Sequence, residues 1–85
     1  MEIPLTELKE GETGVITRIE IGFGRGWRWG RGIRKRLADM GLTPGTKVTI
    51  IRSAPLNGPI EAHVRGYKLA IGRDIAERIF VEVQR

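Results

Sequence analysis

The sequence predicts a mostly β domain: a small barrel of about five strands, with one short helix after the first strand and a single helical turn before the last strand. Three observations lead to this fold class. Apolar and polar residues alternate in several short runs, turn signals separate these runs closely, and one segment alone has the apolar spacing of a helix. Short strands linked so closely favour a barrel, because closure removes exposed strand edges.

The length of 85 residues predicts a single domain, 1–85, with a thin core and no room for a separate catalytic domain. The chain has no cysteine, which excludes disulfides and thiolate metal sites. Its first residues are acidic and poor in apolar side chains, so we expect no signal peptide. No apolar run approaches the roughly 20 residues of a membrane-spanning helix. We therefore expect a cytoplasmic protein.

The first part of the chain predicts a lead-in followed by a strand. Leu5 and Leu8 are expected to pack against the core before a turn at Gly11. Apolar and polar residues then alternate over 13–21, which predicts the first strand. Its two faces are expected to carry Val15, Ile19 and Ile21 on one side and Ile16 on the other.

Residues 22–32 form a segment rich in glycine, arginine and tryptophan. Five glycines in these eleven residues disfavour both helix and strand, so we expect a mobile loop. Trp27 and Trp29 each carry a large apolar area that is costly to leave in water. We expect them either to fold back onto the barrel or to meet a partner.

The segment that follows predicts a capped helix. Ile33, Leu37 and Met40 have the i, i+4, i+7 spacing of one apolar stripe, which predicts a helix over 33–40. Gly41 suits the left-handed C′ position, and Leu42 can then fold back on Leu37 in a Schellman closure.

A tight turn and the second strand come next. Pro44 and Gly45 suit the two central positions of a type II turn, because proline fixes φ and glycine accepts a positive φ. Residues 46–53 predict a strand with Val48 and Ile50 on one face.

The remaining elements are short and separated by turn signals at 56–59 and Gly66. Strands are predicted at 60–65, with Ile60, Ala62 and Val64 facing inward, at 67–71 and at 79–83. Asp74 is predicted to N-cap a single helical turn that runs through Arg78.

Basic residues are concentrated in one part of the chain, which has a net charge of +5. Six of the fifteen lie in a run without acids: Arg25, Arg28, Arg31, Arg34, Lys35 and Arg36. The rest of the chain is close to neutral, so attraction to an acidic partner depends on this run. Basic residues interleaved with aromatic ones also occur in nucleic-acid interfaces, but no recognised motif accompanies them here. A nucleotide site is excluded because Trp27 replaces the last glycine of a G-x-G-x-x-G pattern.

Catalytic and metal-binding signals are weak. The single serine, Ser53, has one histidine in the whole chain as a candidate partner, so we expect no enzyme. That histidine, His63, lies on an outward strand face with Glu61 two residues away. The two are weak metal-ligand candidates, because a ferrous site normally needs several convergent ligands. We expect no cofactor.

The elements together resemble the ferrous iron transport protein A (FeoA) family across most of the chain. In the first half, the matching positions are Leu5, Leu8, Gly11, Gly14, Ile16, Arg36-Leu37, Met40-Gly41-Leu42 and Pro44-Gly45. In the second half, they are Ala54-Pro55, Gly58-Pro59, Val64, Gly66, Leu69, Ile71, Ala76, Ile79 and Val81. The family usually links its first strand to the helix by a short segment, so the longer 22–32 loop departs from the pattern.

The resemblance implies an SH3-like barrel that acts as a small cytosolic accessory of ferrous iron uptake, with a membrane permease that carries a GTPase domain as its partner. A similar domain forms the C-terminal part of some iron-dependent repressors. The alternative is therefore a regulatory binding module that contacts nucleic acid or a regulator. No small-molecule substrate is implied.

A docking surface at the end of the helix is our main site prediction. Its residues are Arg36, Leu37, Met40, Gly41 and Leu42, with Trp27 and Trp29 as further docking elements. Leu37 and Met40 also fit a purely structural interpretation as core residues, with Gly41 as a cap. The two interpretations are compatible. Nucleic acid is not the expected partner, and pairing of copies through exposed strand edges stays open.

Overall fold

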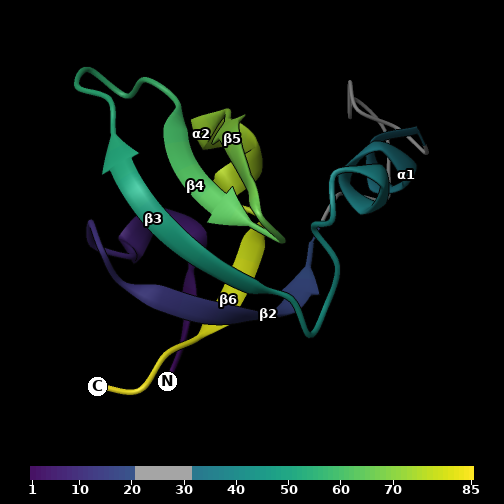
Figure 1. The fold of residues 1–85 in the computed structure, drawn as a ribbon, viewed down its shortest axis with the longest axis horizontal. Helices are drawn as coiled ribbons and strands as arrows, with labels where there is room; N and C mark the ends of the chain where they lie inside the picture. The colour runs from purple at the N-terminus through teal and green to yellow at the C-terminus, as the bar shows by residue number, and fades with distance from the viewer. Residues whose placement is uncertain (21–31) are drawn as a thin grey trace.

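The computed structural model describes residues 1–20 and 32–85. Its elements in chain order are β1 (Glu2–Pro4), the 3-10 turn η1 (Leu5–Glu7), β2 (Thr13–Ile19), α1 (Gly32–Asp39), β3 (Lys47–Ser53), β4 (Ile60–Val64), β5 (Tyr67–Ile71), α2 (Arg73–Ala76) and β6 (Ile79–Glu82). The strands form one antiparallel sheet in the order β1-β6-β2-β3-β4-β5, strongly bent around the core (Figure 1). The predicted mostly β fold, with a helix before β3 and a helical turn before the last strand, is confirmed.

The sheet has one strand more than the sequence indicates. Residues Glu2–Pro4 form β1, which pairs with β6 so that Ile3 lies opposite Val81. Within the described residues, β1 and β5 stand at the two ends of the sheet order. The expectation that closure removes all strand edges is therefore wrong, and among residues 1–20 and 32–85 no strand pairs with the outer edge of β5.

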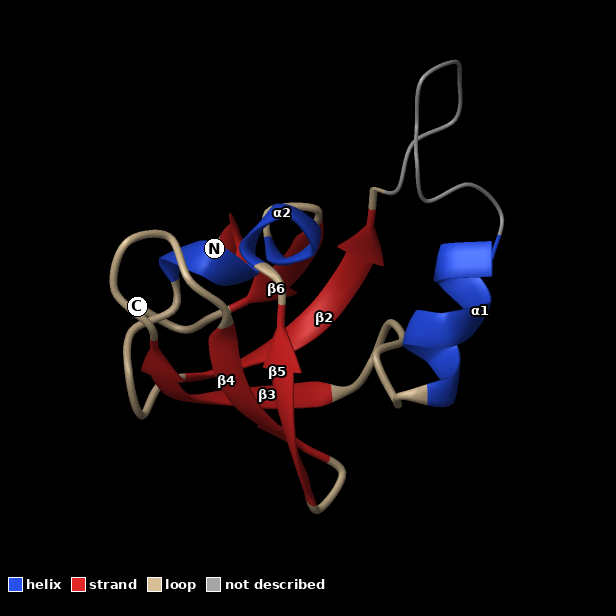
Figure 2. Ribbon diagram, turned by 90° about the horizontal axis from the view of Figure 1, so that it is seen from above, coloured by secondary structure: helices blue, strands red, loops and turns tan. Residues whose placement is uncertain are grey.

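The core lies inside the bend of the sheet, with α2 and η1 together at one end of it and α1 apart on another side (Figure 2). Leu5 and Leu8 of the lead-in are buried in it, as predicted. The inward residues predicted for β3 and β4 are also buried: Val48, Ile50, Ile60, Ala62 and Val64. Helix α1 contributes Ile33 and Leu37.

A bulge changes the faces of β2. In β2, Ile16 pairs with Val81 and Arg18 pairs with Phe80, so Thr17 is an extra residue. The bulge puts both Ile16 and Ile19 against the core, whereas simple alternation had placed them on opposite faces. The predicted face assignment is wrong for this reason, because a bulge shifts every later side chain by one position. Ile21 lies outside the described residues.

The turn chemistry after α1 is as predicted. Gly41 has φ +86, its N–H donates to the Ala38 carbonyl at 2.9 Å, and the Leu42 N–H donates to the Leu37 carbonyl at 2.8 Å. These are the two hydrogen bonds of a Schellman closure. Gly45 has φ +92, and the Thr46 N–H donates to the Thr43 carbonyl at 3.1 Å, as a type II turn requires.

The N-cap of α2 differs from the prediction. Gly72 holds the cap position, and its carbonyl accepts from the Ala76 N–H at 2.9 Å. Asp74 lies inside the first turn, where its carboxylate accepts from the N–H of Ile75 at 2.9 Å. A carboxylate in the first turn still complements the helix dipole, so Asp74 contributes from a different position.

Candidate partner-docking site

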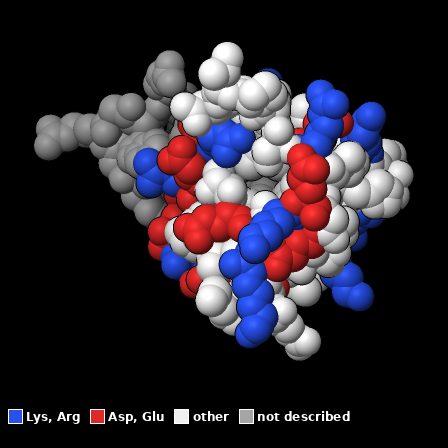
Figure 3. All heavy atoms as spheres, turned by 90° about the vertical axis from the view of Figure 1, so that its left-hand side faces the viewer, with Lys and Arg blue, Asp and Glu red and all other residues white. Residues whose placement is uncertain are grey.

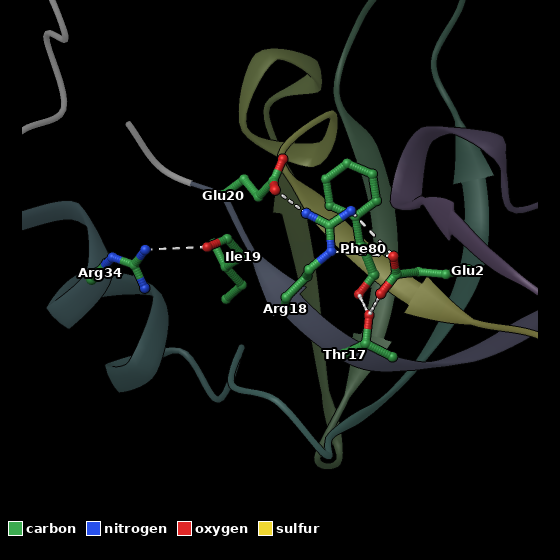
Figure 4. A network of polar contacts seen from close by, with 7 residues as sticks. All are labelled: Glu2, Thr17, Arg18, Ile19, Glu20, Arg34 and Phe80. Carbon is green, nitrogen blue, oxygen red and sulfur yellow. Dashed lines mark hydrogen bonds and ion pairs between the residues drawn. The ribbon is translucent and has the colours of Figure 1, made fainter. Parts of the chain in front are cut away.

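Helix α1 is connected to the rest of the molecule at both ends. Near its start, Arg34 points toward the end of β2, and its Nη2 donates to the Ile19 carbonyl at 3.2 Å (Figure 4). At its end, the Schellman closure leads into Leu42, which is almost completely buried. The helix therefore has a defined position beside the sheet.

Arg65, in the hairpin between β4 and β5, contacts the end of α1. Its Nε donates to the Gly41 carbonyl at 3.3 Å, and its Nη2 donates to Thr46 Oγ1 at 3.0 Å. A cation at a helix C-terminus is favourable because the last carbonyls carry partial negative charge. Arg65 thus sets the spacing between α1 and the hairpin.

Two grooves separate α1 from β5. The first has a volume of about 520 Å³ and is lined by Ala38, Asp39, Met40, Gly41, Thr43, Arg65, Tyr67 and Leu69. The second has a volume of about 450 Å³ and is lined by Ile33, Arg36, Leu37, Asp39, Met40, Ala70, Ile71, Gly72 and Ile75. Asp39 and Met40 line both, so Met40 is an apolar side chain between two hollows. We call this region the α1–β5 surface.

The structure divides the predicted docking residues into exposed and buried ones. Arg36 and Met40 are exposed, and Met40 is 37% exposed. The interpretation of Met40 as a core residue is therefore wrong, because the helix stripe turns away from the core after Leu37. Leu37 and Leu42 are 2% and 1% exposed. Leu42 lines neither groove, so its direct role as a docking residue stays a prediction.

Several residues of this surface come from segments that the sequence prediction did not connect with α1. Tyr67 is 66% exposed at the start of β5, and Leu69 is half-buried against the core. Ile75 of α2 also packs partly against the core and lines the second groove. The sequence offered one signal for these residues. Tyr67 and Leu69 alternate on the same face of the predicted strand, and the tyrosine lies at the end of that strand.

The charge at the α1–β5 surface is predominantly positive. Asp39 forms an i,i+4 ion pair with Lys35 at 3.3 Å. Arg36 lines the second groove and has no ion pair among the described residues, while Arg65 lines the first groove. Carboxylates on a partner would therefore meet two guanidinium groups here.

The opposite side of the molecule has a different charge distribution. Figure 3 shows basic and acidic side chains interleaved there, without a large patch of one sign. Elsewhere in the chain, an ion pair joins Arg85 to Glu12 at 2.8 Å. The hydrogen bond from Arg85, with a second from the Lys9 N–H, lowers the pKa of Glu12 to about 2. The two charges of this pair therefore offset one another.

A further polar network joins three strands. Glu2 of β1 accepts from Thr17 Oγ1 at 2.5 Å and from Arg18 Nε at 3.2 Å (Figure 4). Arg18 also pairs with Glu20 and lies over the ring of Phe80, 4.0 Å from its centroid. The hydrogen bond from Thr17 is the main cause that lowers the pKa of Glu2. The network holds the short edge strand β1 onto β2 and β6.

The weak metal candidates lie on the outer face of β4. His63 is exposed, and the carboxylate of Glu61 pairs with Arg52 at 3.4 Å and with Lys68 at 4.0 Å. Across residues 1–20 and 32–85, no three His, Cys, Asp or Glu side chains gather where they could hold an ion. Two cations on Glu61 disfavour a third, so His63 and Glu61 stay weak candidates.

Trp27 and Trp29 lie outside the described residues, as does most of the 22–32 loop. Their docking role stays a prediction. None of the described helices is long and apolar enough to cross a membrane.

The fold and surface define a class: a small SH3-like β domain with two grooves beside its helix. Residues 3–83 match the family named FeoA domain. The chain therefore belongs to the FeoA domain family, as the sequence resemblance implied.

Two curated relatives and one solved structure are similar over nearly the whole chain. A putative Fe(2+) transport protein A of Methanocaldococcus jannaschii is 37% identical over 93% of this chain and 84% of its own length. An Fe(2+) transport protein A/Fe(2+) transporter FeoB fusion protein of Porphyromonas gingivalis is 35% identical over 93% of this chain, which spans 8% of the fusion. The crystal structure of an iron uptake regulatory protein (FeoA) is 33% identical, with TM-score 0.79 and 99% of both chains covered.

The fold also occurs in a regulator. A manganese-dependent transcriptional repressor has TM-score 0.77 and 17% identity over 98% of this chain and 42% of its own. At this identity the likeness shows the fold alone.

Proposed function

We propose that this chain is a non-enzymatic accessory of ferrous iron uptake that docks on the cytoplasmic side of a membrane permease with a GTPase domain and helps to assemble or regulate it. The α1–β5 surface would make the contact. The observation that carries the proposal is the exposed Met40 between two grooves with a basic rim. Apolar anchors surrounded by charged residues are the usual composition of a protein interface.

The fusion relative supports the choice of partner. In that protein, a segment similar to this chain and an Fe(2+) transporter are parts of one polypeptide. Covalent linkage gives two domains a high effective concentration, so a contact between them is favoured. We infer that separate chains of this family make the same contact without the covalent link.

Co-purification with the permease tests the proposal. Met40→Asp places a charge between the two grooves, where burial in an interface would desolvate it. We expect binding to weaken by roughly tenfold or more, which corresponds to about 1.4 kcal/mol. The fold should remain intact, because Met40 is already 37% exposed.

Leu56→Asp is the matched control, since it also replaces an exposed apolar residue with an acid. Leu56 is 97% exposed, in the hairpin between β3 and β4, on the side of the molecule away from α1 (Figure 1). Its φ of +58 also suits aspartate better than leucine. Equal binding by wild type and folded Met40→Asp would contradict the proposed surface.

The alternative of a regulatory module that contacts nucleic acid has a separate test. The run of basic residues that suggests this alternative, from Arg25 to Arg36, lies partly outside the described residues. Titration with duplex DNA at increasing salt separates the two functions, because phosphate contacts release counterions. Binding that persists at physiological ionic strength would favour the regulatory module, and we expect none.

A further inference from the structure

We propose that the outer edge of β5 binds an extended, acidic segment of the protein partner by strand addition. Alternate side chains of that segment would enter the grooves of the α1–β5 surface. This inference rests on the proposed function and deepens it, because it specifies the conformation and charge of the segment that the partner supplies.

The backbone of β5 presents free hydrogen-bonding groups at its outer edge. The hairpin has a two-residue loop, with φ +50 at Arg65 and φ +85 at Gly66. In such a hairpin the flanking pair is hydrogen-bonded, and bonded pairs then recur at every second residue. The N–H and C=O groups of Lys68 and Ala70 therefore point away from β4. No other strand in the described part of the chain pairs with this edge.

The two edge strands differ in how well they are protected. β1 has three residues and contains Pro4, which cannot donate a main-chain hydrogen bond. β5 has five residues, no proline, and a regular register with β4 from Ile71 to Tyr67. Among the residues of β5 itself, the charged side chain of Lys68 is the one feature that protects the edge. An added strand is therefore far better accommodated at β5 than at β1.

The grooves lie where the side chains of an added strand would project. The inward side chains of β5 become more exposed toward the hairpin: Ile71 is 3% exposed, Leu69 is half-buried, and Tyr67 is 66% exposed. All three line the grooves that separate β5 from α1. Neighbouring strands in a sheet direct their side chains to the same two faces. Side chains on the inward face of an added strand would therefore enter the grooves beside Met40.

The charges favour an acidic occupant over a second copy of this chain. Arg36 and Arg65 line the grooves, and the side chain of Lys68 is 67% exposed on the strand itself. The one acid in the grooves, Asp39, is already paired with Lys35. A copy added edge to edge would bring its own Arg65 and Lys68 to these cations, and like charges across a strand pair are destabilising.

Ala70→Pro tests the main-chain contact, with the purified permease in detergent as the probe. Proline removes the outward N–H and obstructs an added strand, but leaves the hydrogen bonds between β4 and β5 in place. We expect binding to weaken by roughly tenfold or more, as for the loss of a net 1.4 kcal/mol. Ala70→Val is the comparison, because it also enlarges the side chain but keeps the N–H, and its binding should weaken less than that of Ala70→Pro.

Hydrogen exchange on the wild-type protein gives a second readout that needs no variant. In the complex, the amides of Lys68 and Ala70 should become protected, whereas the amide of Leu69 is protected by β4 already in the free protein. Unchanged exchange at Lys68 and Ala70 in a saturated complex would overturn the inference even if Ala70→Pro fails to fold.

The outcomes separate the two proposals. If wild type and Ala70→Pro bind the permease equally, strand addition is wrong and the proposed function stands. If wild type does not bind the permease at all, the proposed function fails. If wild type dimerises without the permease and Ala70→Pro abolishes the dimer, the occupant is a second copy, which also overturns the inference.

Discussion

The side chain of Arg65 occupies the space that a β-carbon on Gly41 would need: such an atom would lie 2.8 Å from Arg65 Cδ and 3.2 Å from its Nε. Gly41 also has φ +86, and its carbonyl accepts a hydrogen bond from Arg65 at 3.3 Å. The end of α1 and the hairpin between β4 and β5 therefore pack closely against each other at Gly41.

Gly41→Ala is therefore expected to be destabilising for two reasons. A left-handed alanine costs about 1–2 kcal/mol, and displacement of Arg65 adds the loss of its hydrogen bonds to the Gly41 carbonyl and Thr46. Urea denaturation measures the total loss in free energy of unfolding.

Gly45→Ala is the control, because Gly45 has φ +92 and open space around the added carbon. With Arg65→Ala in the background, the cost of Gly41→Ala should fall to that of Gly45→Ala. A cost unchanged by Arg65→Ala would contradict the close fit.

Gly14 permits close packing of β2 on β6. A β-carbon there would lie 2.9 Å from both Val81 Cβ and Val81 Cγ2, and 3.2 Å from Val83 Cγ1. Because these atoms belong to stiff, buried valines, Gly14→Ala should lower the free energy of unfolding by roughly 1–3 kcal/mol. Gly32→Ala has open space at the start of α1 and should leave stability unchanged or slightly higher. Thermal denaturation of the two variants measures the difference in stability. Equal stability would mean that β2 and β6 move apart around the new methyl group at little cost in free energy.

The pair of Glu12 and Arg85 should make stability depend on acid pH. The pKa of Glu12 is about 2 in the folded protein, below its ordinary value of 4.5, chiefly because Arg85 donates hydrogen bonds to it. A lowered folded pKa stabilises the fold above pH 4.5, and this contribution is lost as pH falls from 4.5 toward 2.

Urea midpoints measured at several pH values for wild type and Glu12→Gln test this dependence. The variant should be less stable than wild type at neutral pH, and the difference should shrink as pH falls through the same window. Arg85→Ala should flatten the pH dependence in the same way. A difference between wild type and Glu12→Gln that is constant across pH would show that the carboxylate charge has no role.

Local sequence patterns predicted the features that depend on near neighbours. Gly41, Pro44 and Gly45 were assigned correctly because each turn is defined by the dihedral preferences of the residues within it. The inward positions of β4 were also predicted, because strict alternation over 60–64 fixes a face without reference to other strands.

Features that depend on distant residues were missed. The pairing of Ile3 with Val81 joins the two ends of the chain, so a short apolar segment became an extra strand. The bulge at Thr17 exists relative to Phe80 and Val81 of β6, and nothing in the sequence around Thr17 marks it. Sequence alternation alone therefore placed Ile16 and Ile19 on opposite faces, although both pack against the core.

The amino-acid sequence by itself determined the family, the fold class and the capped end of α1, because turn residues and apolar spacing act over a few neighbours. Only the tertiary structure decided that α1 and β5 line a common surface with two grooves. Met40 has the spacing of a core residue, yet it lies between two grooves because β5 does not cover it. Exposure depends on which segments pack over a side chain, and that packing is decided by contacts between residues far apart in the chain.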